Sequence, residues 1–237
     1  MRDQTWWIIG ASEGLGAALA RQMADRGARL ILSARSAQRL QGVSDALGAR
    51  ALPMDVTDPD SVAAACAQVG AVDGLIYCVG LYEPMAATDW TPDLAQQMVA
   101  ANFTGALSVL SHSLPPMLAR GRGHIVLIGS LAGHRGLPGA IGYGASKAAL
   151  MHLGENLRVD LRGTGVRVQV ANPGFIRTRL TDKNSFAMPQ LMTPEDAAAR
   201  VLRHMAGKRF SLSFPAPFAW LFTLGRYLPL RLFHRLF

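Results

Sequence analysis

Short apolar runs alternate with amphipathic stretches along most of this 237-residue chain. Several runs are apolar throughout, for example Ile-Val-Leu-Ile at residues 125–128, as expected for strands covered by helices on both faces of a sheet. Strands that alternate with helices predict parallel βαβ units, and so an α/β fold with a doubly wound parallel sheet. The predicted strands are residues 5–10, 28–34, 49–54, 74–78, 124–129, 166–171 and 210–214, and the predicted helices are residues 15–26, 37–47, 60–68, 92–120, 143–162 and 194–206.

The length and composition fit one large α/β domain better than two small ones. Half of the residues are apolar and 17% are charged, which supplies a sizeable core and excludes a disordered chain. The two cysteines, Cys66 and Cys78, lack the spacing of a metal site, so we expect reduced thiols and no bound metal. Residues 1–5 lead directly into a strand without the apolar region of a signal peptide, which predicts a cytoplasmic protein.

A glycine-rich segment, Gly-Ala-Ser-Glu-Gly-Leu-Gly, follows the first predicted strand at residues 10–16. Glycine at 10 allows a tight exit from the strand, glycine at 14 lets the backbone approach a pyrophosphate, and glycine at 16 lets the helix pack closely. The helix that begins here offers N–H donors and a favourable dipole to an anion. The alternative is a glycine-rich turn without a ligand, but the place after the first strand favours dinucleotide binding. The predicted contacts are Gly10, Ser12, Glu13, Gly14, Leu15 and Gly16.

The end of the second predicted strand bears on the choice of cofactor. An acidic residue there would hold the ribose hydroxyls of NAD, whereas this chain has Ala34 followed by Arg35. Because arginine can pair with a 2′-phosphate, we predict NADP(H) in preference to NAD(H), the alternative being a solvated surface arginine. Asp55 and Val56, after the third predicted strand, are expected near the adenine.

Tyr143 and Lys147 lie four residues apart on one predicted helix and therefore project from the same face. A free phenol titrates near pH 10, and a nearby ammonium together with the positive nicotinamide ring would lower the pKa of Tyr143 toward neutrality. In reduction the Tyr143 phenol would give its proton to the oxygen of the substrate carbonyl. Ser130, just after a strand, can donate a hydrogen bond to that oxygen. The pair alone is a weak signal, but together with Ser130 and the glycine segment it predicts hydride transfer to or from a carbonyl.

The chain resembles the short-chain dehydrogenase/reductase family over residues 5–206. The resemblance implies a Rossmann-type sheet of seven strands in the order 3-2-1-4-5-6-7, and assembly into a homodimer or homotetramer. It implies Tyr143 as the general acid/base, Ser130 as the substrate-positioning group, Lys147 on the nicotinamide ribose, and Asn102 holding a water in a proton relay. The residues that carry it are Gly10, Gly14, Gly16, Asp55, Asn102, Ser130, Tyr143, Lys147, Asn172, Pro173 and Gly174.

The same resemblance predicts that the segment after the sixth strand wraps the nicotinamide, through Pro173, Gly174, Ile176 and Thr178. The family often has Asn-Asn-Ala-Gly after the fourth strand, where this chain reads Tyr-Cys-Val-Gly at residues 77–80. Side-chain hydrogen bonds that steady the sheet are therefore missing or replaced. The backbone at Gly80 can still pass beside the cofactor despite this change. A second difference is Ile9, which stands where the family commonly has a threonine before the first glycine.

The net charge of +8 is concentrated near the C-terminus, where residues 197–237 hold seven basic side chains and no acidic one. We divide the chain into an NADP(H)-binding catalytic domain, residues 1–213, and an aromatic, basic tail, residues 214–237. The uncharged stretch 210–225 contains two prolines and is shorter than the roughly 20 residues that span a bilayer. The tail predicts either peripheral contact with the inner face of an anionic membrane or packing on the domain or a partner subunit. No nucleic-acid partner is expected, because no supporting motif accompanies the basic residues.

The predicted lid over the substrate, residues 179–193, is mainly apolar and includes Phe186 and Met188. It predicts an apolar ketone, aldehyde or secondary alcohol as the substrate. His134 could contact that substrate, although a solvated loop histidine is the favoured interpretation. The leading hypothesis is an NADPH-dependent carbonyl reductase. Its rivals are an NADP(H)-binding regulator or scaffold without turnover, and a membrane-recruited reductase that modifies lipids.

Overall fold

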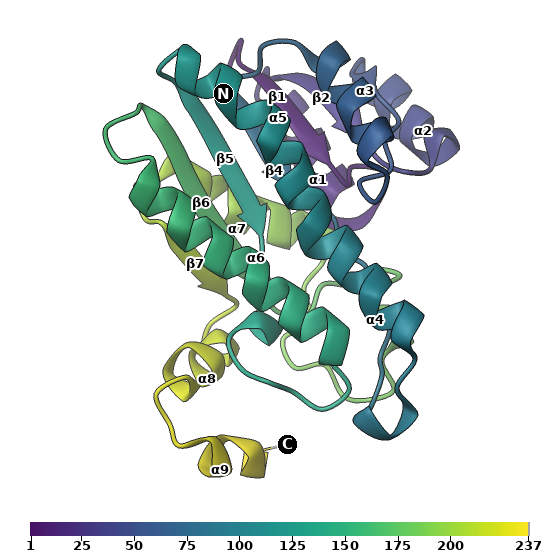
Figure 1. The fold of residues 1–237 in the computed structure, drawn as a ribbon, viewed down its shortest axis with the longest axis vertical. Coiled ribbons are helices and arrows are strands. Elements are labelled where there is room, and N and C mark those ends of the chain that lie inside the picture. Colours follow the sequence, from purple (N-terminus) through teal and green to yellow (C-terminus); the bar gives the residue numbers. More distant parts are fainter. Residues whose placement is uncertain (237) are drawn as a thin grey trace.

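A computed structural model describes residues 1–236 and contains a single parallel sheet of seven strands in the order β3-β2-β1-β4-β5-β6-β7 (Figure 1). The α/β class is the one that the sequence pattern predicted, and the strand order is the one that the family resemblance implied. The strands are β1 Thr5–Ile9, β2 Arg29–Ser33, β3 Arg50–Ala51, β4 Gly74–Tyr77, β5 Gly123–Ile128, β6 Val166–Pro173 and β7 Ser211–Phe214.

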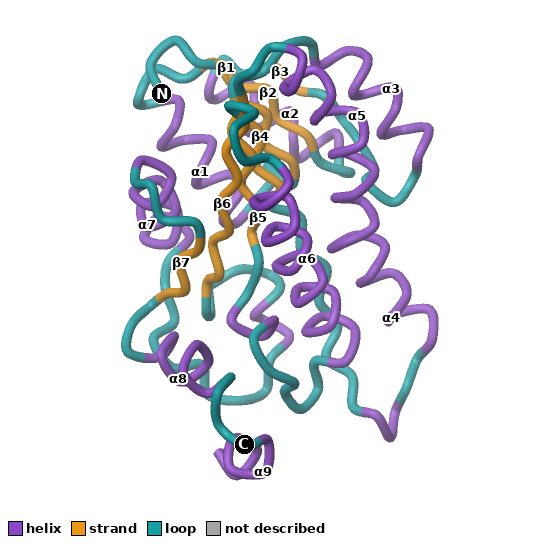
Figure 2. Tube along the Cα trace, turned by 60° about the vertical axis from the view of Figure 1, so that its left-hand side comes forward, coloured by secondary structure: helices purple, strands orange, loops and turns teal. Residues whose placement is uncertain are grey.

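Two layers of helices cover the sheet, with α1 and α7 on one side and α3, α5 and α6 on the other (Figure 2). The longer helices are α1 Gly14–Ala24, α2 Ala37–Leu47, α3 Pro59–Val69, α4 Pro92–Val99, α5 Gly105–Ala119, α6 Ile141–Asp160 and α7 Pro194–Ala206. Two further helices, α8 Phe218–Gly225 and α9 Leu230–Phe233, and a final 3-10 turn, His234–Leu236, form the end of the described chain.

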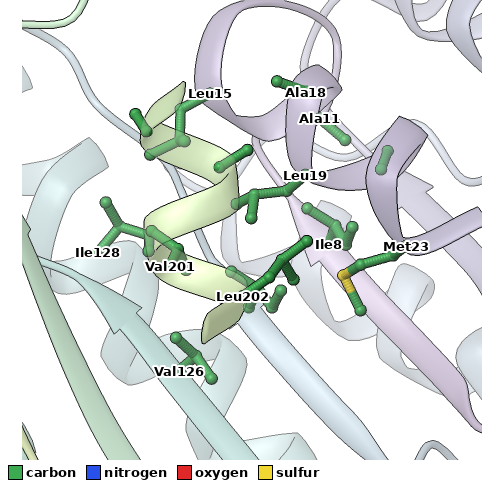
Figure 3. Close-up of a cluster of buried hydrophobic side chains, with 14 of the residues drawn as sticks. Ile8, Ala11, Leu15, Ala18, Leu19, Met23, Val126, Ile128, Val201 and Leu202 are labelled. Atoms are coloured by element: carbon green, nitrogen blue, oxygen red, sulfur yellow. The ribbon is translucent and has the colours of Figure 1, made fainter. Parts of the chain in front are cut away.

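Strand β1 shows why the apolar runs are continuous. Trp6 and Ile8 face the core under α1 and α7, whereas Trp7 and Ile9 face the core under the opposite helices, and all four are buried. In Figure 3, Ile8 lies close to Leu19 of α1, which approaches Val201 of α7. Both faces of the sheet therefore exclude water, so strand residues that point to either face must be apolar.

Two predicted elements differ from the structure by more than two residues at an end or in continuity. The third strand keeps only two residues, at the edge of the sheet where it pairs with β2 alone, although the N–H groups of Leu52 and Met54 still donate to β2 and the residue after it. Pro53 lies between these two donors, on the unpaired side of the strand, where no N–H is needed. The predicted helix 92–120 is interrupted by a π turn, Ala100–Thr104, between α4 and α5. At Gly105, where α5 begins, a Cβ atom would lie 2.7 Å from the Tyr77 hydroxyl, so the close approach of β4 and α5 requires glycine.

The tail folds back on the domain instead of extending from it. Ala219, Phe222 and Phe233 are buried together with Leu131, and the guanidinium of Arg135 donates to backbone carbonyls of residues 225, 226 and 228. Packing on the domain, one of the two predicted alternatives, therefore accounts for one face of the tail. Among residues 1–236, no helix is long and apolar enough to cross a membrane.

Candidate active site

The residues predicted to bind cofactor and substrate gather where the parallel strands end. Gly10 follows β1, Gly80 lies three residues after β4, Ser130 lies two residues after β5, and Pro173 is the last residue of β6. Because β1, β4, β5 and β6 are neighbours in the sheet, these segments lie along one edge of it. Ligands of open α/β sheets bind at this carboxyl edge.

The glycine segment has the shape of a phosphate-binding cradle. Gly10 has a φ of +88°, and its N–H donates to the Ser33 carbonyl at 2.8 Å. A Cβ atom on Gly16 would collide with the Gly10 carbonyl oxygen, and one on Gly14 would lie 2.9 Å from Thr178 Cγ2. Glu13 does not cap α1 with its side chain, which instead pairs with Arg179. The backbone at the start of α1 is therefore bare and faces Thr178, which fits a dinucleotide pyrophosphate.

Tyr143 and Lys147 both lie near the start of α6, and the Lys147 ammonium is 6.0 Å from the centre of the Tyr143 ring. Lys147 is buried, and its Nζ donates to the carbonyls of Ile128 at 2.9 Å and Val79 at 3.0 Å. The Ser130 and Tyr143 hydroxyls share a hydrogen bond. Tyr143, Lys147 and Ser130 therefore come together as the sequence predicted.

Burial sets the protonation of this group. It raises the pKa of Tyr143, and the hydrogen bond from Ser130 lowers that pKa only in part. Burial also lowers the pKa of Lys147 to about 8, against a smaller opposing effect of Cys78. In the chain alone desolvation outweighs the hydrogen bond from Ser130, whereas the lowered phenol pKa expected from the sequence also involves the positive nicotinamide ring. At neutral pH Tyr143 is a neutral phenol with a proton to donate.

Asn102 lies in the π turn, and its side chain is engaged by neighbouring loops. Its Oδ1 accepts from the Leu81 N–H at 2.7 Å, while its Nδ2 donates to the Leu81 carbonyl at 2.9 Å and to Ser146 Oγ at 3.0 Å. These bonds fix the loop that carries the Val79 carbonyl beside α6. The side chain therefore positions the loop around Lys147.

Tyr77 takes over the steadying role of the asparagines that the sequence lacks. It is fully buried, and its hydroxyl donates to the Ala101 carbonyl at 2.6 Å. Since Ala101 precedes Asn102, β4 is tied directly to the π turn. The sequence showed only that an asparagine was missing at residue 77. The partner is 24 residues away, so local reasoning could not find it.

The residues predicted to lie near the adenine and its ribose phosphate are found around the ends of β2 and β3. Arg35 is exposed two residues beyond Ser33, whose carbonyl accepts the N–H groups of both Gly10 and Ala11. Asp55 is half-buried and accepts from the N–H and hydroxyl of Thr57. Val56 is buried against Gly105. Arg35 thus lies two residues after the carbonyl that holds the glycine cradle, and its side chain is exposed.

Tyr82, which sequence reasoning did not single out, links Tyr143 to the lid. The two rings meet edge to face with centres 5.1 Å apart, and the Tyr82 hydroxyl donates to Asn184 Oδ1 at 3.0 Å. Lys183 pairs with Glu83 beside this contact. The lid is therefore fastened to the loop after β4, directly over the Tyr143 ring.

Other predicted lid and cofactor contacts also fall at this edge. Ile176 is buried and bridges to Met192, and Gly80 faces Leu180, whose Cδ2 would lie 3.3 Å from an added Cβ. His134 is half-buried, and its Nε2 is 2.9 Å from Ser213 Oγ, so the favoured interpretation as a solvated histidine was wrong. Within residues 1–236, no three His, Cys, Asp or Glu side chains gather as a metal site.

Comparisons with known proteins agree with this geometry. A family model described as short chain dehydrogenase matches residues 4–188. An uncharacterized oxidoreductase of Myxococcus xanthus is 38% identical over 98% of this chain and 96% of its own length. A short chain dehydrogenase from Burkholderia cenocepacia in complex with NADP is 26% identical, with a TM-score of 0.87 over 99% of this chain and 97% of that one. A short-chain dehydrogenase from Sphingobium yanoikuyae in complex with NADPH is 27% identical, with a TM-score of 0.84 over 90% and 89% of the two chains.

Proposed function

The chain belongs to the short-chain dehydrogenase family, and from that premise we propose that it is an NADP(H)-dependent reductase of apolar ketones or aldehydes, reversible toward secondary alcohols. The observation that carries the proposal is the contact of Ser130 with a half-buried, neutral Tyr143 beside the Lys147 ammonium. A nicotinamide cofactor supplies the hydride to the carbonyl carbon in reduction and accepts it in oxidation.

The proton for the carbonyl oxygen comes from Tyr143. Its raised pKa keeps the phenol protonated at neutral pH, so Tyr143 can donate as negative charge develops on the substrate oxygen. The Ser130 hydroxyl donates a hydrogen bond to the same oxygen and orients it. Lys147 places a positive charge beside the forming phenolate and stabilises it. Asn102 and Tyr77 keep the surrounding loop and π turn in place.

Cofactor binding is proposed to use the backbone cradle of residues 10–16 for the pyrophosphate, together with Thr178 and the neighbouring residues 173–176 for the nicotinamide. Arg35 would pair with the 2′-phosphate, a role supported by its exposure and by the lack of an acidic residue at the end of β2. The structures bound to NADP and NADPH that this chain resembles make the phosphorylated cofactor reasonable.

The substrate class follows from the walls of the site. Phe175 meets Phe186 edge to face with ring centres 5.8 Å apart, and Tyr82 covers Tyr143. Aromatic and aliphatic walls favour an apolar group next to the carbonyl.

We also expect a homodimer or homotetramer, which light scattering of the purified protein would measure.

The test is oxidation of NADPH in the presence of a panel of apolar ketones and aldehydes. Tyr143→Phe keeps the ring against Tyr82 but removes the proton, so turnover should fall about 100-fold or more while NADPH binding is retained. Tyr227→Phe, which alters a tyrosine that is 75% exposed in the tail, is the matched control. Unchanged turnover in Tyr143→Phe would contradict the mechanism. NADPH binding without oxidation by any member of the panel would favour the regulator or scaffold.

A further inference from the structure

The outer face of the tail exposes an unusual set of side chains. It consists of large apolar residues that face solvent and are interleaved with arginines. The exposed apolar members are Trp220, Leu224, Tyr227, Leu228, Leu230, Leu232 and Leu236, and the arginines are Arg226, Arg231 and Arg235. We propose that this docking face, residues 220–236, binds the protein to the surface of an anionic lipid membrane.

The docking face is held rigidly by the inner face of the same segment. Phe233 is fully buried and packs so closely under Gly225 that a Cβ there would lie 2.7 Å from its ring. The Phe222 and Phe233 rings meet with centres 6.3 Å apart, and Arg135 donates to the carbonyls of Arg226 at 2.6 Å and Leu228 at 2.7 Å. The exposed side chains therefore belong to a folded element with an apolar outer side.

The residue types fit a lipid surface. Tryptophan and tyrosine prefer the boundary between headgroups and acyl chains, and leucines beside them bury apolar area at that depth. Three exposed arginines add attraction to anionic headgroups, and residues 197–237 contain no acidic side chain that would oppose it. Two copies of this face packed together would instead bring like charges together. A membrane with negative charge is therefore the better partner.

The position of the face in the molecule supports this assignment. The helices α8 and α9 lie beyond the carboxyl ends of the strands, at the same end as the start of α4 (Figure 1). Two further exposed aromatic side chains belong to loops at this edge, Trp90 just before α4 and Phe186 in the lid. One end of the molecule thus gathers the exposed aromatic residues.

The docking face is also joined to the lid by stacked rings. Phe218 of α8 stacks on Phe175 with ring centres 5.6 Å apart, and Phe175 contacts Phe186 of the lid. The Phe218 N–H donates to Gln190 of the lid at 3.3 Å. Docking through α8 would therefore set the lid against the lipid surface. Lipid binding itself does not depend on turnover, so its test is independent of the proposed reaction.

The experiment is flotation of the full chain with vesicles of phosphatidylcholine alone or mixed with phosphatidylglycerol. We expect the protein to float with the mixed vesicles and to be released as the salt concentration rises. Changing the three arginines to glutamine should weaken partitioning by about fivefold for each residue. Trp220→Glu with Leu224→Glu, which removes apolar contact on α8 without touching a buried residue, should lower partitioning at least tenfold.

The matched control is Val159→Glu with Leu118→Glu, two exposed apolar residues on α6 and α5 away from the docking face. It adds the same charge and should float like the parent chain, and circular dichroism shows that each variant is folded. The proposal is overturned if the parent chain does not float with the mixed vesicles, or if the α8 variant floats equally well. It is also overturned if vesicles bind neither protein while the α8 variant dissociates an oligomer of the parent, because the face would then join two copies.

Discussion

Changing Tyr77 to phenylalanine removes one hydroxyl from a fully buried position and leaves the ring in place. That hydroxyl donates to the Ala101 carbonyl at 2.6 Å, and Ala101 is itself buried in the π turn. The substitution therefore isolates the single polar contact by which β4 holds the turn that carries Asn102. Because burial raises the pKa of Tyr77, the hydroxyl stays protonated and remains a donor throughout the working pH range.

The loss of stability in Tyr77→Phe has two parts, the lost hydrogen bond and the buried Ala101 carbonyl that is left without the Tyr77 donor. A neutral intramolecular hydrogen bond contributes about 1 kcal/mol net, and a buried carbonyl without a donor costs about 1–3 kcal/mol. No cavity term is added, because the ring volume is kept. The free energy of unfolding should fall by about 2 kcal/mol, and the melting temperature by about 6 °C for a chain of this size.

Urea unfolding of the parent and of Tyr77→Phe measures this difference, with an unchanged slope against urea. Tyr227→Phe is the control, since Tyr227 is exposed and its change should stay within about 0.5 kcal/mol. If Tyr77→Phe is also within about 0.5 kcal/mol of the parent, the hydroxyl does not support the turn.

Three further predictions concern the cofactor, the core and the tail. Arg35→Ala should weaken NADPH binding by about 10- to 100-fold and leave NADH binding unchanged in fluorescence titrations, and equal affinities of the parent for both cofactors would contradict the assignment. Burial, with the charge of Arg167, lowers the pKa of His124 in the folded chain to about 4. As the pH falls from about 6.5, His124 is therefore protonated in the unfolded chain before it is protonated in the folded chain. Stability should fall by up to about 3 kcal/mol between pH 6.5 and 4, less so in His124→Gln, as measured by urea unfolding at each pH. Phe233→Ala should cost about 3 kcal/mol and expose the tail to proteases, unlike Leu236→Ala at an exposed site.

The sequence predicted the sheet well because burial on both faces leaves a local signal. The helices 37–47 and 194–206 have the predicted bounds in the structure, because residues at their N-termini are of the types that cap helices. Ser36 accepts from the Arg39 N–H, and Thr193 accepts from the Asp196 N–H. Signals of this kind lie within a few residues of the element that they define.

The interruption of the helix 92–120 had no such local signal. The π turn depends on contacts from elsewhere in the chain, namely Tyr77 on Ala101 and Leu81 on Asn102. The contact between Tyr82 and Asn184 spans 102 residues in the same way. The residue types around Tyr143 were predicted, but the rise in its pKa caused by desolvation in the chain alone was not, because desolvation depends on how far the fold covers the ring. The predicted lowering, which includes the effect of a bound nicotinamide ring, stays a prediction.

The ammonium of Lys147 is buried, although burial disfavours a charge, and its surroundings suggest a reason for this arrangement. Its ammonium is held by two neutral carbonyls, those of Ile128 and Val79, which compensate a positive charge only in part. Negative charge that develops on the Tyr143 oxygen during proton donation would complete this compensation at a distance fixed by α6. In the proposed mechanism the interaction would therefore be stronger as the reaction proceeds than before it, which is the condition under which a buried charge speeds a reaction. A neutral residue at position 147 would fill the space but supply none of this difference.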